Sequence, residues 1–180
     1  MLKAGDRAPD FTLESRRGVR TLSDAKGKYA VVYFYPRDNT PGCTREGQAF
    51  SLATKAFSAA GAIVYGISKD SVESHDRFAD TCNITIDLLS DADLSAHKAY
   101  GAFGEKTMYG KKVIGTIRST FIVDPAGQVA RVFPAVKVDG HADAVLAAIS
   151  ELKAGARLRA KAPARRSAAP AKIARKTGVR

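Results

Sequence analysis

The stretch YAVVYFYPRDNTPGCTREGQAF, residues 29–50, decides the fold because it leads from a buried strand into a helix. Residues 29–36 form a continuous apolar, β-branched and aromatic run, which is typical of a central strand covered on both faces. The run stops at Pro36, and a lone cysteine, Cys43, follows two residues after Pro41. The chain has one other cysteine, Cys82, so few ordinary roles for a cysteine in this loop remain open.

Outward from this stretch, strand and helix patterns alternate up to residue 152. Apolar residues spaced by three or four positions indicate a helix that ends at Gly61, and residues 62–68 indicate a second buried strand. The other expected elements are a helix from an N-cap at Ser71 to Thr81 or Cys82, a strand at 87–89, a helix from Asp91 or Asp93 to about Gly101, a hairpin of residues 116–124 and 128–134, and an amphipathic helix at 140–153. This order predicts a thioredoxin-like three-layer α/β sandwich with a central mixed sheet.

The net charge of +11 is concentrated at one end of the chain. Residues 153–180 contain ten Lys or Arg and no acid, which leaves 19 basic and 18 acidic residues before them. The segment is rich in Ala, Pro, Lys and Arg and has no aromatic residue, so it buries too little surface to offset its ordering entropy. We expect one folded domain at 1–152 and a disordered basic tail at 153–180. Such a tail could contact nucleic acid non-specifically, or could be solvated without a partner.

Composition also limits what the two thiols can do. No apolar run approaches the roughly 20 residues needed to cross a bilayer, and the start MLKAGDRAPDF lacks the apolar core of a secretory signal. We therefore expect a cytoplasmic protein without membrane contacts, in which a permanent disulfide would be rare. Two cysteines and three scattered histidines make a poor metal site, so no metal and no cofactor are expected. We interpret His75, His97 and His141 as surface or helix-end residues.

The expected topology places Cys43 at the carboxyl end of a central strand, the edge where ligand sites of α/β sheets gather. Thr40 is a good N-cap and Pro41 suits the first helical position, so Cys43 becomes the third helical residue. Free backbone N–H groups and the positive end of the helix dipole would favour a thiolate there. A Cys-x-x-Cys pair is excluded because Thr40 and Glu46 occupy the two partner positions. A single reactive thiolate is favoured over a small buried thiol.

At this point the residues match a known pattern, Pro-x-x-x-Thr-x-x-Cys, in Pro36, Thr40 and Cys43. The chain resembles the peroxiredoxins, and most closely the peroxiredoxin Q or bacterioferritin comigratory protein group. The resemblance continues through LKAGDRAPDFTL at 2–13, LLSDAD at 88–93 and IRSTFIVDPAGQV at 117–129, and it fades after about Leu152. In the last of these segments Arg118 occupies the position of the family's active-site arginine.

The resemblance implies a thioredoxin-dependent peroxidase that reduces hydrogen peroxide and organic hydroperoxides in antioxidant defence. Cys43 would attack a peroxide oxygen and become a sulfenic acid, the first step of cysteine oxidation. Arg118, the Thr40 hydroxyl and the N–H groups around Gly42 and Cys43 would bind the peroxide oxygens, while Pro36 would shield the thiolate from water. The implied partners are a peroxide and thioredoxin or another thiol reductant, and we expect a monomer or weak homodimer.

The recycling of Cys43 is where the chain departs from part of the family. Many members carry a resolving cysteine five residues after the reactive one, but Gln48 occupies that position here. A second group carries it on the next helix, where Cys82 lies about one turn beyond the aligned position near Ala79. Cys82 is therefore either a resolving cysteine that forms a transient disulfide with Cys43, or an inert buried thiol. In the second case an external thiol would reduce Cys43 directly.

Two other functions compete with the peroxidase. A catalytically silent binding module with a thioredoxin fold would keep the sheet, but it would not need Thr40, Cys43 and Arg118 together. A thioredoxin-fold module associated with DNA would act through the basic tail, and that role is compatible with peroxidase activity. The intact set of three residues favours the enzyme.

Overall fold

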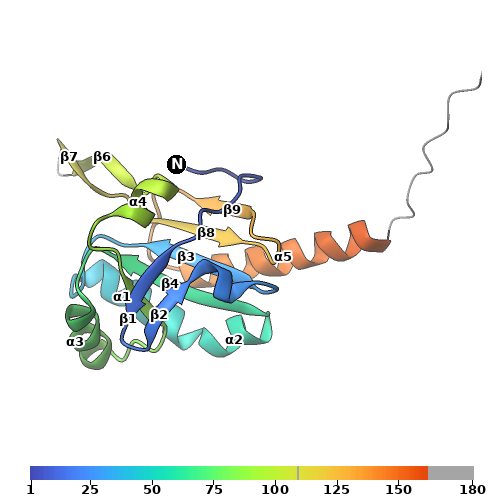
Figure 1. Cartoon of the computed structure of the whole chain (residues 1–180), viewed down its shortest axis with the longest axis horizontal. Helices are drawn as coiled ribbons and strands as arrows, with labels where there is room; N and C mark the ends of the chain where they lie inside the picture. Colours follow the sequence, from blue (N-terminus) through green and yellow to red (C-terminus); the bar gives the residue numbers. More distant parts are fainter. Residues whose placement is uncertain (109, 162–180) are drawn as a thin grey trace, which may run out of the picture.

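The computed structural model describes residues 1–108 and 110–161 (Figure 1). The strands are β1 (Thr12–Ser15), β2 (Gly18–Thr21), β3 (Tyr29–Phe34), β4 (Ala62–Ser68), β5 (Asp87–Ser90), β6 (Phe103–Met108), β7 (Lys111–Thr116), β8 (Ser119–Val123) and β9 (Val129–Phe133). The helices are the short 3₁₀-helix η1 (Leu22–Ala25), α1 (Pro41–Leu52), α2 (Thr54–Ala59), α3 (Val72–Cys82), α4 (Ser95–Tyr100) and α5 (His141–Lys161).

Within these residues a seven-stranded mixed sheet has the order β2-β1-β5-β4-β3-β8-β9. Strands β3, β4 and β5 are parallel, and β8 runs antiparallel to β3. Because Phe34 at the end of β3 pairs with Ile67 on one side and Ser119 on the other, the loop after β3 meets the residue that precedes β8. This register brings the Cys43 segment and Arg118 to the same edge of the sheet.

Two apolar clusters cover the two faces of the sheet. Side chains of α1, α2, α3 and α5 pack on one face, together with Val31 and Tyr33 of β3. Side chains of η1, α4 and the N-terminal segment pack on the other, together with Val32 and Phe34. Strand β3 is buried along its whole length, as its apolar sequence predicts. The predicted thioredoxin-like three-layer sandwich with a mixed sheet is confirmed.

Some elements differ from the sequence expectation because local side-chain hydrogen bonds intervene. The expected helix after Cys43 is divided at Ala53 into α1 and α2. Here the Ser51 hydroxyl donates to the Gly47 carbonyl at 2.7 Å and the Thr54 hydroxyl to the Phe50 carbonyl at 3.3 Å. Such bonds compete with the regular helical pattern and bend helices.

Helix α4 begins later than expected, with Leu94 rather than Asp91 or Asp93 at the N-cap. Both aspartates still cap the helix: Asp91 accepts from the Ala96 and His97 N–H groups, and Asp93 accepts from the Ser95 N–H. The sequence analysis also missed the β1–β2 and β6–β7 hairpins. Figure 1 shows the second of these projecting from the body of the protein.

Helix α5 continues to Lys161, beyond the boundary expected at residue 152 (Figure 1). Ala, Leu, Arg and Lys dominate residues 154–161, and these residue types sustain a helix without needing to be buried. The expectation of a disordered tail is therefore wrong for 153–161, and its remaining part, 162–180, lies outside the described residues. Over the part of the chain that the structure describes, no helix is long and apolar enough to span a membrane.

Candidate active site

The turn from β3 into α1 places Cys43 at the start of a helix, as its sequence predicts. Thr40 occupies the N-cap position with an extended backbone, and Pro41 is the first helical residue. The Thr40 side chain does not cap the helix; its hydroxyl lies 3.2 Å from the Arg37 carbonyl oxygen, to which it donates. This hydroxyl therefore stays at the protein surface beside the first turn, where Thr40 is half-buried.

Arg118 is the polar partner of the Cys43 sulfur. Its Nη2 atom lies 3.1 Å from Cys43 Sγ, and Cys43 is only 2% exposed. A Cβ atom at Gly42 would lie 3.4 Å from this same nitrogen, an ordinary contact distance, so the guanidinium lies directly beside Gly42. Burial alone would lower the pKa of Arg118, but the nearby Glu46 and Cys43 outweigh it and the net shift is upward. Arg118 is thus a permanent cation held against the sulfur.

Glu46 holds the other side of the same guanidinium and was missed by the sequence analysis. Arg118 Nη1 donates to Glu46 Oε2, and Glu46 is 1% exposed. Burial raises the pKa of Glu46 to about 7, and the charge and hydrogen bond of Arg118 oppose that rise. A usable signal was present in the sequence: Glu46 is three residues after Cys43, so the two share a helix face.

Two further groups complete the electrostatics of the site. The pKa of Tyr33 lies well above its ordinary value, chiefly because the ring is buried and further because Glu46 and Cys43 are near. Lys106 on the β6–β7 hairpin donates to the Thr116 carbonyl oxygen at 2.6 Å. Burial and Arg118 lower the pKa of Lys106, while Cys43 opposes the change. The site therefore has two cations beside one thiol and one buried carboxyl group.

The structure brings only some of the expected site residues into contact. Cys43, Arg118 and Gly42 meet at the start of α1, whereas Pro36 and Thr40 lie in the preceding loop and are half-buried. Cys82 is the last residue of α3 and is also half-buried, against the apolar cluster to which Cys43 belongs. The Cys82 carbonyl accepts from Gln48 Nε2 at 3.0 Å, so the end of α3 is tied to α1. Both thiols are free.

The interpretation of the three histidines as surface or helix-end residues is wrong with respect to exposure. His75 is 1% exposed, His97 is 0% exposed and His141 is 6% exposed. Each is paired: His75 with Asp38, His97 with Asp91, and His141 with the Thr120 hydroxyl. The partners of His75 and His141 come from distant segments of the chain, whereas Asp91 immediately precedes the helix of His97 and caps it. Among the described residues, no group of three potential metal ligands forms.

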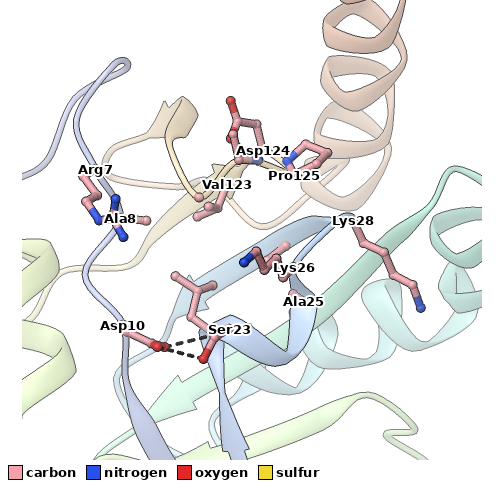
Figure 2. Close-up of a pocket in the computed structure, with 14 residues that line it drawn as sticks. Arg7, Ala8, Asp10, Ser23, Ala25, Lys26, Lys28, Val123, Asp124 and Pro125 are labelled. Atoms are coloured by element: carbon pink, nitrogen blue, oxygen red, sulfur yellow. Dashed lines mark hydrogen bonds between the residues drawn. The ribbon is translucent and has the colours of Figure 1, made fainter.

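A pocket of about 200 Å³ lies elsewhere, at the start of β3 and the end of β8 (Figure 2). On one of its walls the Ser23 hydroxyl donates to Asp10 at 2.8 Å. Lys28 and Ala30 at the start of β3 line the pocket, whereas Cys43 follows the end of that strand. None of the site residues lines the pocket, so it is separate from the thiol chemistry.

Comparison with known proteins agrees with this arrangement. The sequence model of the AhpC/TSA family matches residues 4–132. The chain is 49% identical over 141 residues to peroxiredoxin Bcp of Xanthomonas campestris pv. campestris, a match that covers 78% of this chain and 88% of the relative. It is 39% identical over 146 residues to peroxiredoxin Bcp of Escherichia coli, covering 81% and 94% of the two chains.

Solved structures give the same result. The bacterioferritin comigratory protein of Xanthomonas campestris, studied for its alkyl peroxide reduction activity, superimposes with a TM-score of 0.77 at 44% identity. That match covers 83% of this chain and 98% of the other. A structure of AhpC from Mycobacterium tuberculosis superimposes with a TM-score of 0.72 at 26% identity, covering 86% and 95% of the two chains.

Proposed function

Because the chain belongs to the AhpC/TSA family and is a thiol-dependent peroxidase of the peroxiredoxin Bcp or Q kind, we propose that Cys43 is the residue that peroxide oxidises. The single observation that carries this assignment is the 3.1 Å contact between Arg118 Nη2 and Cys43 Sγ. A guanidinium at this distance stabilises a negatively charged sulfur, and the thiolate is the nucleophilic form of cysteine. Cys82 has no such partner among the described contacts.

The reaction at Cys43 is a displacement on a peroxide oxygen. The thiolate electron pair forms an S–O bond, the O–O bond breaks, and an alcohol or water leaves once the departing oxygen has taken up a proton. The sulfur is oxidised to a sulfenic acid, and the peroxide is reduced. Arg118 stabilises the charge that develops on the departing oxygen, and the Thr40 hydroxyl and nearby N–H groups orient the peroxide.

Pro36, Thr40 and Gly42 have supporting roles in this proposal. Pro36 lacks an N–H donor and limits the access of water to the thiolate. Thr40 contributes a hydrogen bond without a charge. Gly42 lies beside Arg118 Nη2, since a Cβ there would lie 3.4 Å from this nitrogen, and its N–H is among the groups that orient the peroxide.

Cys82 is proposed to resolve the sulfenic acid through a transient disulfide with Cys43. The tie between Gln48 and the Cys82 carbonyl supports a location near α1. A disulfide needs Cα atoms within about 7 Å, so the end of α3 and the first turn of α1 would have to open. Helix α3 ends at Cys82, and its C-cap Asn83 is in the left-handed conformation with its N–H bonded to the Ala79 carbonyl oxygen. Opening the last turn would therefore have to break this cap. Thioredoxin or another thiol would then reduce the disulfide.

One experiment tests the nucleophile and the recycling step together. Wild-type protein and Cys82→Ser receive one equivalent of hydrogen peroxide, and intact mass and non-reducing peptide mapping follow. The proposal expects a Cys43–Cys82 linkage in the wild type and a single added oxygen on Cys43 in the variant. An oxygen on Cys43 in both proteins, with equal turnover, would establish a one-cysteine mechanism. Oxidation that spares Cys43 would overturn the assignment of the nucleophile.

The association with DNA through residues 153–180 gains no support from the relatives, whose names are those of peroxidases. The ten basic residues of that segment remain its basis. A DNA mobility shift that weakens with salt and disappears on removal of the segment would support it. The monomer or weak homodimer and the cytoplasmic location stay predictions as well.

A further inference from the structure

His75 and Asp38 form a buried pair next to the loop that precedes Cys43. His75 lies near the start of α3 and is 1% exposed, and Asp38 is 5% exposed. The His75 Nδ1 atom lies 2.9 Å from Asp38 Oδ2 and 3.1 Å from Asp38 Oδ1. The Asp38 carboxylate also accepts from the Tyr35 hydroxyl at 2.8 Å and from the Ser74 hydroxyl at 2.7 Å. Three side chains thus converge on this one carboxylate.

Both ring nitrogens of His75 have oxygen partners. Nδ1 faces the Asp38 carboxylate and also lies 3.3 Å from the Tyr35 hydroxyl oxygen. Nε2 lies 3.2 Å from the Leu89 carbonyl oxygen in β5. The ring is therefore held between Asp38 on one side and the end of a central strand on the other.

The surroundings of the pair also favour an ionised Asp38. Burial by itself raises the pKa of Asp38, but the hydrogen bond and charge of His75, with the hydroxyls of Ser74 and Tyr35, outweigh it, so the pKa lies below its ordinary value. The N-terminus of α3 attracts an anion, which also favours the Asp38 carboxylate. Asp70 is the second carboxylate in this cluster, and it accepts from the Ser68 hydroxyl at 2.8 Å.

These contacts anchor the loop that carries Pro36 and Thr40. Asp38 lies midway between these two residues, and its backbone N–H donates to Asp70 Oδ2 at 2.9 Å. The residues that hold Asp38 come from the segment 70–75, with Tyr35 as the exception. Asn39, the next residue, is in the left-handed region with φ of 56°. The course of this irregular loop toward Cys43 therefore depends on its attachment to α3.

We propose that His75 is a positioning residue for the reaction of Cys43 with peroxide, and that it fixes the loop of Pro36 and Thr40 through Asp38. The inference rests on the proposed role of Cys43. A shift of about 1 Å in a catalytic group can reduce a rate about 100-fold. Loosening the loop should therefore slow the reaction that needs Thr40 and Pro36, and should spare a reaction that needs only an accessible thiol.

The test variant is His75→Gln, which can keep one hydrogen bond but lacks the ring that contacts both Asp38 and Leu89. Its matched control is His97→Gln, because His97 forms the same kind of pair with Asp91, with Nδ1 2.6 Å from Oδ2 and both side chains at 0% exposure. His97 lies on α4 and packs against Phe34, on the other face of the sheet from α3. Each variant therefore loses a buried His–Asp pair, but only the pair of His75 includes a residue of the loop that carries Pro36 and Thr40.

Two rates are measured for each folded variant: the reaction of Cys43 with hydrogen peroxide, and its alkylation by iodoacetamide. The ratio of the first to the second should fall about 10- to 100-fold in His75→Gln and stay within about twofold in His97→Gln. Equal ratios in the two variants, or parallel loss of both rates in His75→Gln, would overturn the proposal. If Cys43→Ser itself still consumed peroxide, the proposed function would fail instead, so the two failures are distinguishable.

A second variant keeps the proposal testable if His75→Gln does not fold. Ser74→Ala removes one donor from Asp38 at a half-buried position. It should lower the same ratio less, by about twofold to fivefold, because one neutral hydrogen bond is lost. An unchanged ratio in Ser74→Ala would overturn the proposal.

Discussion

Cys43 and Cys82 are the same residue type at opposite ends of two helices, and their surroundings differ accordingly. Cys43 is the third residue of α1, whereas Cys82 is the last residue of α3. The Cys43 sulfur lies 3.1 Å from Arg118 Nη2. Among the described contacts at Cys82, the hydrogen bond goes to the carbonyl and comes from Gln48. Cys43 is buried and Cys82 is half-buried.

The difference shows that burial and inertness are separate properties of a thiol. The more buried sulfur of the two is the one beside a cation and a helix N-terminus, both of which stabilise a thiolate. The more accessible sulfur lies at a helix C-terminus, where the dipole disfavours negative charge. These surroundings agree with the different steps proposed for the two thiols, with Cys43 as the attacking group and Cys82 as its later partner.

The largest expected effect comes from exchanging each sulfur for oxygen in turn. Cys43→Ser should lower the rate of peroxide consumption by about 10³-fold or more, because serine without a base is a weak nucleophile. Cys82→Ser should leave the first turnover unchanged, since its sulfur acts after the peroxide has reacted. Stopped-flow measurement of the first turnover with hydrogen peroxide checks both. Retained peroxide consumption in Cys43→Ser would show that Cys43 is not the nucleophile, so the proposed difference between the two thiols would fail.

The next effect concerns the cation that distinguishes the two sites. Arg118→Ala should slow the peroxide reaction about 100- to 1000-fold and move the ionisation of Cys43 to higher pH, because a stabilising charge is lost. Thr40→Val is the matched variant: it removes a neutral hydrogen bond, so about tenfold is expected with little change in ionisation. Thiolate absorbance and stopped-flow rates across pH give both quantities. If neither variant differs from wild type by more than about twofold, the site is misassigned.

The smallest effect concerns Glu46, which supports Arg118. The folded-state pKa of Glu46 is raised to about 7 from 4.5 by burial. A carboxyl group shifted in this direction contributes stability that is fully present below pH 4.5 and is lost as pH rises through about 7. Relative to Glu46→Gln, the wild type should therefore lose up to about 3 kcal/mol of unfolding free energy between pH 4.5 and pH 8.

Urea unfolding at the two pH values measures this difference. Glu105→Gln is the control, because Glu105 is an exposed carboxylate that pairs with Lys112 at 3.0 Å on the β6–β7 hairpin. The unfolding free energy of Glu105→Gln should change with pH in the same way as that of the wild type. A Glu46→Gln profile parallel to the wild type would show that Glu46 titrates in its ordinary range.

Much of the fold was predictable because its signals are local and periodic. The apolar runs at 29–36 and 62–68 became the parallel strands β3 and β4, and Ser71 caps α3 as expected, accepting from the Ser74 N–H. The hairpins β1–β2 and β6–β7 were missed because they are short or exposed, with weak alternation. Lys111, Lys112 and Ile114 of β7, for example, are exposed.

The residues of the candidate site were likewise predictable only in part. The positions of Thr40 and Cys43 at a helix start could be predicted from local residues, because an N-cap and a proline at the first helical position are local features. Pro36 entered the expected site only through the family resemblance. Arg118 was identified only through a family resemblance, since a lone arginine before a strand carries no signal of its own. Glu46 was overlooked although its spacing from Cys43 indicates a shared helix face. Its burial depends on Arg118, which is 72 positions away in the sequence.

By itself the sequence determined the α/β sandwich, the helix start at Cys43 and the lack of a neighbouring second cysteine, because backbone propensity and apolar period act over a few residues. Only the tertiary structure decided which polar groups are buried with partners. His75 reaches Asp38 across 37 positions, and Arg118 reaches both Cys43 and Glu46 through the register of β8 against β3. A buried charge is stable only beside its partner, and sheet pairing brings such partners together from distant parts of the chain.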